Sequence, residues 1–129
     1  MTKVLHTESA PAAIGPYVQG VDLGNMVLTS GQIPVNPATG EVSADIAEQA
    51  RQSLDNVQAV VEASGLTVKD IVKLTVFVKD LNDFGTVNEV YGKFFDEHGV
   101  ANYPARSCVE AARLPKDALV EVEAIAYKK

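Results

Sequence analysis

The sequence predicts an α+β fold in which two helices pack on one face of a mixed β-sheet. Two long segments show helical periodicity, and shorter segments with β-type alternation precede, separate and follow them. Long helices that alternate with strands favour a layer of helices over a sheet. A chain of 129 residues can build a substantial core but not two domains, so residues 1–129 are expected to form a single domain.

The expected order of elements is strand, strand, helix, strand, helix, strand, strand. The first two strands, residues 17–23 and 26–30, flank Gly24-Asn25, a pair that suits a tight hairpin turn. A loop punctuated by proline and glycine follows at residues 31–42 and leads to the first helix.

The two helices are predicted from apolar spacing and from their end signals. Asp45 followed by Glu48 resembles a capping box, and Gly65 is a suitable C-terminal stop for the first helix. The second helix is expected to close at Gly99. The apolar stripes are Ile46, Ala50, Leu54, Val57 and Val61 in the first helix, and Phe84, Val87, Tyr91 and Phe94 in the second.

Three further strands complete the predicted sheet. Residues 72–79 alternate apolar and polar side chains, with the apolar face at Val72, Leu74, Val76 and Val78. Two more strands are expected on either side of a turn at residues 114–117. The last strand has apolar residues on both faces, so each face needs a cover. Since two helices cover one face only, the sequence predicts that another subunit covers the second.

The composition narrows the possible functions. Hydrophobic residues make up 47% and charged residues 22%, as in ordinary soluble proteins, and no apolar run approaches the roughly 20 residues of a membrane span. The N-terminus lacks the apolar core of a secretory signal and the chain has one cysteine, so a cytoplasmic location is expected. The net charge of −6 argues against nucleic-acid binding, which relies on a basic surface.

The most informative side chains lie in residues 103–126. Arg106, Cys108 and Glu110 are two apart on a predicted strand and therefore share one face. Such a polar row, where a core strand would carry Val or Ile, is expected at functional or strained sites. Arg106 could grip a ligand carboxylate bidentately. It could instead have a structural role, as a partner of Glu121 or Glu123 or as an exposed charge at the sheet edge, and its position alone favours neither interpretation.

Glu121 is a candidate general base for activating water if it faces a pocket, and a solvated charge if it does not. Whether it shares a sheet face with Arg106 depends on the turn at residues 114–117, and the sequence leaves this open. Cys108 is expected to be an inert thiol, because His6 and His98 lie far from it in sequence and no base is suggested.

Weaker candidates lie elsewhere in the chain. Tyr17, at an expected strand start, could pack or line a cleft, and Ser30-Gly31 could end the hairpin or present a bare backbone amide to a ligand. Asn88 lies inside a helix, where Asn is mildly unfavourable. There is no phosphate-binding loop, zinc-type Cys/His spacing or nucleophile elbow, so neither a metal nor an organic cofactor is expected.

Three segments resemble one known family. APAAIGPYVQG, SGQIPVNPATGE and ARSCVEAARLPKDALVEVEAIA occur in that order between Ala10 and Ala126. They resemble the RidA family (also called YjgF/YER057c/UK114), and its archetypal enamine/imine deaminase branch in particular, because Arg106 is present. The resemblance implies a chorismate-mutase-like fold and a homotrimer with a site in each inter-subunit cleft. It also implies hydrolysis of 2-imino acids, the tautomers of 2-aminoacrylate and 2-aminocrotonate, to 2-oxo acids and ammonia.

The resemblance also implies a role for each candidate residue. Arg106 would bind the substrate carboxylate, Glu121 would orient or activate the hydrolytic water, and the main-chain carbonyl of Cys108 would help to hold that water or the leaving nitrogen. The other residues expected in the cleft are Tyr17, Ser30, Gly31 and Asn88. Two alternatives stay open: a non-catalytic trimer that binds keto acids in the same clefts, and a ribonuclease or translation inhibitor, which the acidic charge disfavours.

Overall fold

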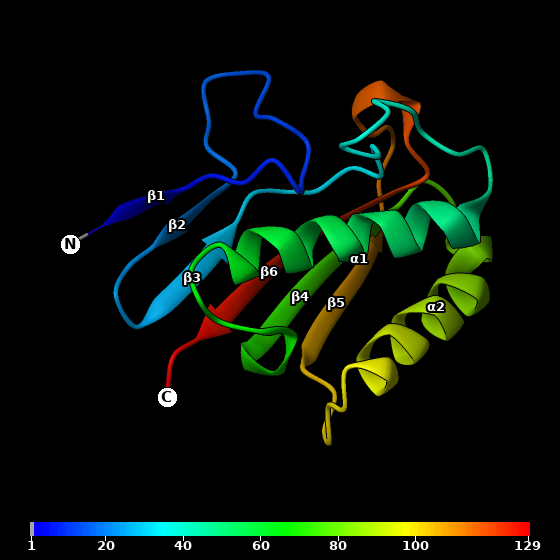
Figure 1. Ribbon diagram of the computed structural model, residues 1–129. Coiled ribbons are helices and arrows are strands. Elements are labelled where there is room, and N and C mark those ends of the chain that lie inside the picture. Colours follow the sequence, from blue (N-terminus) through cyan, green and yellow to red (C-terminus); the bar gives the residue numbers. More distant parts are fainter. Residues whose placement is uncertain (1) are drawn as a thin grey trace.

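A six-stranded sheet forms one layer of the fold and two helices form the other (Figure 1). The computed structural model describes residues 2–129. The elements in chain order are β1 (Lys3–Leu5), β2 (Gly20–Asp22), β3 (Met26–Thr29), α1 (Ile46–Glu62), β4 (Ile71–Val78), α2 (Phe84–Glu97), β5 (Ala105–Glu110) and β6 (Val120–Tyr127). The strand order across the sheet is β1-β2-β3-β6-β4-β5, in which β4 and β5 are parallel and all other neighbours are antiparallel.

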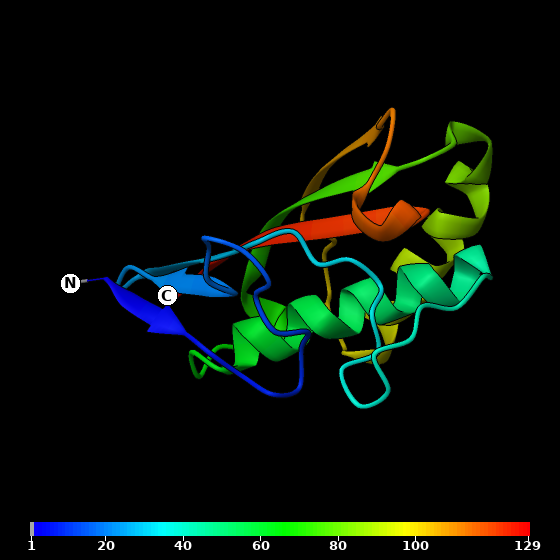
Figure 2. The same ribbon diagram turned by 90° about the horizontal axis from the view of Figure 1, so that it is seen from above.

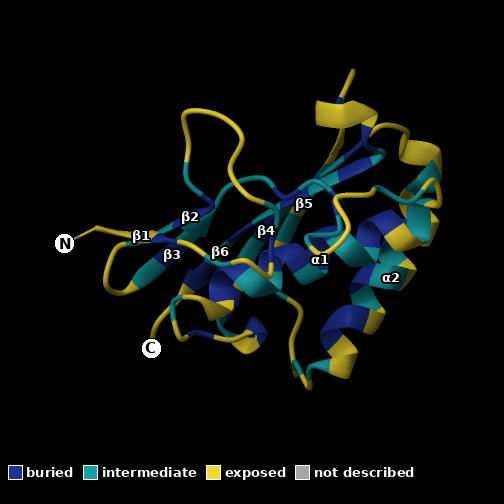
Figure 3. Cartoon of the chain, turned by 45° about the horizontal axis from the view of Figure 1, so that its top comes forward, coloured by how far each residue is buried: buried dark blue, intermediate teal, exposed yellow. Residues whose placement is uncertain are grey.

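Both helices lie on the same side of the sheet, which confirms the predicted α+β arrangement (Figures 1 and 2). The core lies between these two layers, where apolar side chains are almost fully buried. Its members include Val57, Val60 and Val61 of α1, Phe94 and Phe95 of α2, Leu74, Val76 and Val78 of β4, and Val120, Val122 and Ala124 of β6. In Figure 3 the helices show buried residues on one side and exposed residues on the other, as amphipathic packing requires.

The helix ends follow the predicted signals. Asp45 Oδ2 accepts a hydrogen bond from the Glu48 N–H at 2.9 Å and so caps the start of α1. The chain leaves the two helices through Gly65 and Gly99, whose φ angles of 93° and 68° lie in the left-handed region that glycine adopts without strain.

Two strand predictions need correction, and one strand was missed. The hairpin at Gly24-Asn25 is confirmed, but β2 begins at Gly20 and not at residue 17, because the Gln19 side chain bonds to the preceding loop. Strand β1 was not predicted, since three residues give no periodic signal. Val72 is 41% exposed and is not part of the apolar face, because a register shift between Ile71 and Lys73 puts Ile71 in the core.

The side of the sheet opposite the helices is called the open face below. Its apolar residues, placed by strand register, include Leu28, Phe77, Val109, Ile125 and Tyr127. They are partly buried or exposed, whereas the apolar residues on the helix-facing side of β3, β4 and β6 are buried. No second layer of residues 2–129 covers this face (Figure 2). Among the same residues, no helix has the length and apolar character that a membrane span requires.

Candidate active site

Arg106 is held on the helix-facing side of β5 by side chains of α2. Its Nη1 donates a hydrogen bond to Asn88 Oδ1 at 2.6 Å. Its Cζ lies 4.9 Å from the Tyr91 ring centroid and 5.4 Å from that of Phe84, so the guanidinium rests on two aromatic faces. Within residues 2–129 Arg106 forms no ion pair. A fixed cation with unused donors is well suited to a carboxylate ligand.

The salt bridge between Arg106 and Glu121 or Glu123, one of the interpretations open from sequence, is not formed. Glu121 pairs in register with Phe77, and Glu123 with Thr75, on the open face of the sheet. Arg106 pairs with Leu74, whose side chain is buried toward the helices. The side chains of Arg106 and Glu121 therefore lie on opposite faces of the sheet. One chain alone does not bring them into one pocket.

Tyr91 contributes a buried hydroxyl next to this guanidinium. Burial raises the pKa of Tyr91 to about 12, although the nearby Arg106 charge works against the shift. The phenol is therefore neutral at physiological pH. Its oxygen is buried and has no hydrogen-bond partner among the described residues. Tyr91 also lines a surface pocket with Asn88, Tyr103 and Arg106.

Removing the Tyr91 hydroxyl is expected to stabilise the protein. A buried polar group without a partner costs about 1–3 kcal/mol. Tyr91→Phe keeps the aromatic face beneath Arg106 and should raise the free energy of unfolding by about 1 kcal/mol. Thermal unfolding should show a rise in Tm of about 3–5 °C. Tyr91→Leu, which removes the ring as well, is the matched control and should lower Tm. A lower Tm in Tyr91→Phe would show that the hydroxyl has a partner.

Cys108 lies on β5 two residues after Arg106, partly buried against the core. Burial raises the pKa of its thiol, and the Arg106 charge opposes the shift only in part. The thiol is thus protonated at neutral pH, which agrees with the prediction of an inert side chain. Glu110, the third member of the polar row, accepts a hydrogen bond from the Leu81 N–H at 3.0 Å and stabilises the turn before α2.

Glu121 lies beside Gly31 on the open face. A Cβ atom added at Gly31 would come within 2.9 Å of Glu121 Cδ, so any side chain at this position would force the carboxylate to move from its present place. Gln32, the next residue, bridges to Val122 through two backbone hydrogen bonds of 2.7 and 3.1 Å. Burial raises the pKa of Glu121, and the neighbouring Glu123 raises it further. A raised pKa makes this carboxylate a stronger base.

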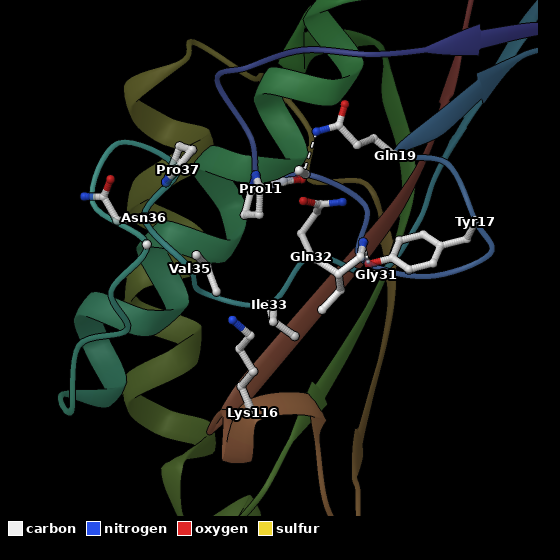
Figure 4. Close-up of a pocket in the computed structure, with 13 residues that line it drawn as sticks. Pro11, Tyr17, Gln19, Gly31, Gln32, Ile33, Val35, Asn36, Pro37 and Lys116 are labelled. Atoms are coloured by element: carbon white, nitrogen blue, oxygen red, sulfur yellow. Dashed lines mark hydrogen bonds between the residues drawn. The ribbon is translucent and has the colours of Figure 1, made fainter.

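Tyr17 and Ser30 belong to the same side of the molecule as Gly31. Tyr17 is not at a strand start but in the exposed loop before β2, where its hydroxyl accepts a hydrogen bond from the Ile14 N–H at 3.4 Å. Ser30 Oγ donates to the Val18 carbonyl at 2.6 Å, so its hydroxyl ties this loop to the end of β3. Tyr17 and Gly31 line a common pocket (Figure 4).

The predicted residues therefore form two groups. Arg106, Cys108 and Asn88 lie on β5 and α2, and the second group, around Glu121, consists of Glu121, Gly31, Ser30 and Tyr17. Sequence reasoning missed the aromatic platform under Arg106. Its signal was the helical spacing of Phe84, Asn88 and Tyr91, which puts them on one face of α2. Within residues 2–129, no cluster of three or more Cys, His, Asp and Glu side chains is placed to hold a metal ion.

A chain with this sequence and fold belongs to a known protein class. The family model described as Endoribonuclease L-PSP matches residues 7–128, and the chain is a member of this family, which includes RidA and YjgF. The 2-iminobutanoate/2-iminopropanoate deaminase of Escherichia coli K12 is 73% identical over 129 residues, which are 100% of both proteins. The predicted resemblance is therefore confirmed.

Solved structures agree with this assignment. The crystal structure of the E. coli yjgF gene product superposes with a TM-score of 0.97 at 72% identity, covering 98% of this chain and 99% of that chain. The crystal structure of E. coli TdcF with bound serine gives a TM-score of 0.97 at 64% identity, with the same coverage of 98% and 99%.

Proposed function

We infer that this protein is a 2-iminobutanoate/2-iminopropanoate deaminase, a hydrolase that converts reactive 2-imino acids to 2-oxo acids and ammonia. The observation that carries this conclusion is the 73% identity, over 129 residues, with the E. coli enzyme of that name. In the reaction, water adds to the C=N carbon, and the resulting carbinolamine loses ammonia as its hydroxyl becomes the carbonyl. No covalent enzyme intermediate is needed, which suits a site with an inert thiol.

Arg106 is assigned to the substrate carboxylate. Asn88 takes one of its donors, and the faces of Tyr91 and Phe84 fix the plane of the guanidinium. The remaining donors are available for a bidentate grip on the carboxylate. Holding the carboxylate in this way fixes the imine carbon relative to the water, and orientation of this kind supplies much of the catalysis in such sites. Serine, bound in the 64% identical TdcF structure, is a ligand of similar size with an α-carboxylate.

Glu121 is assigned to the water. Its raised pKa favours proton abstraction as water attacks, and the protonated carboxyl can then return the proton to the leaving nitrogen. General acid–base assistance of this kind contributes about 10²–10⁴-fold. Cys108 is assigned to hold the water or the nitrogen through its main-chain carbonyl. It lies on β5, one of the two edge strands of the sheet, where part of the backbone has no strand partner.

The complete site is proposed to form between subunits of a homotrimer. Two features support this: Arg106 and Glu121 face opposite sides of the sheet, and the open face carries uncovered apolar residues. In the trimer, Arg106 of one chain would meet Glu121 of the partner subunit, with Tyr17, Ser30 and Gly31 beside the latter. The proposed ligands are small 2-imino acids, handled in the cytoplasm without a nucleic-acid partner.

Mixing two inactive variants should restore activity if the site is shared between chains. We expect co-expressed Arg106→Ala and Glu121→Gln chains to form mixed trimers. Each site then has about one chance in four of receiving an intact Arg106 and an intact Glu121, so about a quarter of the wild-type activity should return. Separately purified variants mixed without subunit exchange are the control. No recovery in verified mixed trimers would mean that both residues act within one chain.

The deaminase function itself is tested by coupling the protein to a threonine dehydratase and recording the release of 2-oxobutanoate. Wild-type protein should accelerate this release over the rate in buffer. No acceleration, together with measurable binding of 2-oxobutanoate, would instead favour a non-catalytic binding protein. RNA cleavage that survives further purification and disappears in Arg106→Ala would favour the activity named in the family description.

A further inference from the structure

A concave pocket of about 210 Å³ adjoins the Glu121 group (Figure 4). It lies between the loop before β2, the loop at residues 31–40 and the turn at Pro115–Asp117. Most of its wall is apolar, with Pro11, Ile14, Ile33, Val35 and Pro37 among the lining residues. A hollow of this kind, apolar with a few polar groups, is typical of a small-molecule site.

Lys116 is the cationic side chain in the lining of this pocket. In Figure 4 it extends from the turn toward the loop that carries Ile33. Within residues 2–129 it forms no ion pair. An apolar pocket with one uncompensated ammonium group is suited to a ligand with an apolar chain and a terminal anion.

The backbone at Lys116 is unusual for a residue with a side chain. Its φ and ψ are 56° and 26°, and the next residue, Asp117, has a φ of 54°. Two consecutive non-glycine residues in the left-handed region are strained, and such strain clusters at functional sites. The turn is held by the Arg113–Asp117 ion pair at 2.8 Å and by the hydrogen bond from the Asp117 N–H to the Leu114 carbonyl at 3.0 Å. This geometry sets the direction in which Lys116 leaves the turn.

Gly31 connects the pocket to the candidate water-activating group. It lines the pocket, and it is also the residue against which the Glu121 carboxylate packs. A substrate whose imine carbon lies near Glu121 could therefore extend its side chain past Gly31 into the pocket. Tyr17, the other shared residue, forms part of the same wall. The pocket thus continues the site that the proposed function places at Glu121.

We propose that this pocket receives the substrate side chain and that Lys116 binds a distal carboxylate there, so that dicarboxylic 2-imino acids are substrates too. This inference rests on the proposed deaminase function. The reaction is unchanged: water adds to the C=N bond of 2-iminoglutarate, ammonia leaves, and 2-oxoglutarate forms. Lys116 pairs with the distal carboxylate and takes no part in proton transfer.

The test compares two imines of equal chain length, 2-iminoglutarate and 2-iminopentanoate, made in situ from the amino acids by an amino-acid oxidase. The measured quantity is the ratio of their kcat/KM values. Lys116→Met should lower this ratio about tenfold, the effect of one charge-assisted hydrogen bond in a partly exposed pocket. Lys116→Gly, which suits the left-handed turn, should lower it equally. Lys116→Arg should keep the wild-type ratio, as should the charge-matched control Lys3→Met.

A ratio that is the same in wild-type, Lys116→Met and Lys116→Gly proteins would overturn the inference and leave the deaminase function intact. Wild-type protein that accelerates 2-oxobutanoate release in the dehydratase assay but does not hydrolyse 2-iminoglutarate would also overturn it. If wild-type protein hydrolysed neither imine and also failed in the dehydratase assay, the proposed function would fail instead. The assignment of Lys116 would then be tested by calorimetry, which measures the affinities of 2-oxoglutarate and 2-oxopentanoate for the protein. Preferential binding of 2-oxoglutarate, weakened about tenfold in Lys116→Met, supports the assignment of Lys116. Equal binding in both proteins contradicts it.

Discussion

Arg106→Ala is expected to lower kcat/KM for 2-iminopropanoate by about 10³-fold, which corresponds to about 4 kcal/mol. The variant removes the cation proposed to hold the substrate carboxylate and leaves Asn88 and the aromatic platform without their partner. The assay is the release of pyruvate from a serine dehydratase reaction, above the rate without the deaminase. Arg106→Lys should also lose most of the activity, because an ammonium group lacks the planar fork.

Arg113→Ala is the matched control for this substitution. Arg113 is also a guanidinium side chain, 79% exposed and paired only with Asp117, so its loss should change stability little. Circular dichroism and the oligomeric state should be the same for all three variants and the wild type. Full activity in a folded Arg106→Ala protein would show that another group holds the substrate carboxylate.

Glu121→Gln is expected to lower kcat by about 10²–10³-fold, because glutamine fits the space beside Gly31 but does not accept a proton from water. The binding of a 2-oxo acid should change much less than kcat, since the assigned carboxylate clamp is Arg106. Glu123→Gln, on the same face of β6, is the matched control and should stay active. Wild-type kcat in Glu121→Gln would assign the water to a different residue.

The pH dependence of kcat should report the same carboxylate. In the proposed substrate complex the substrate carboxylate would neutralise Arg106. Burial and Glu123 would then decide the Glu121 pKa, and both raise it. A general base is active only when ionised, so kcat should fall as the pH drops through a value above the ordinary Glu pKa of about 4.3. Glu123→Gln removes one of the two causes and should move this acid limb to lower pH. An unshifted limb would assign the titration to another group.

The elements that the sequence predicted well are those with local signals. The Asp45 cap, the stops at Gly65 and Gly99 and the alternation along β4 depend on neighbouring residues, and the structure confirms them. Errors arose where a distant part of the chain decides the outcome. Val72 leaves the apolar face because of a register shift in the pairing of β4 with β6. Tyr17 lies in a loop because the side chain of Gln19 forms hydrogen bonds with Thr7 and Pro11, earlier in the same loop.

The candidate site was predictable as a set of residues but not as an arrangement. Arg106, Cys108 and Glu110 do share one face, because strand alternation is local. The faces of Arg106 and Glu121 depend on the register with which β5 and β6 each pair with β4, which lies between them. The support from Tyr91 and Phe84 depends on how α2 packs against β5. These contacts join residues far apart in the chain, so no spacing rule reveals them.

The opposite orientation of Arg106 and Glu121 has a kinetic consequence in the proposed trimer. A newly synthesised chain could not bring its own Arg106 and Glu121 into one site, and it would be inactive until it assembles with other subunits. Specific activity should then depend on protein concentration and fall on dilution below the dissociation constant of the assembly. Only the assembled trimer would hydrolyse the imine, and monomers would contribute no activity in the cell.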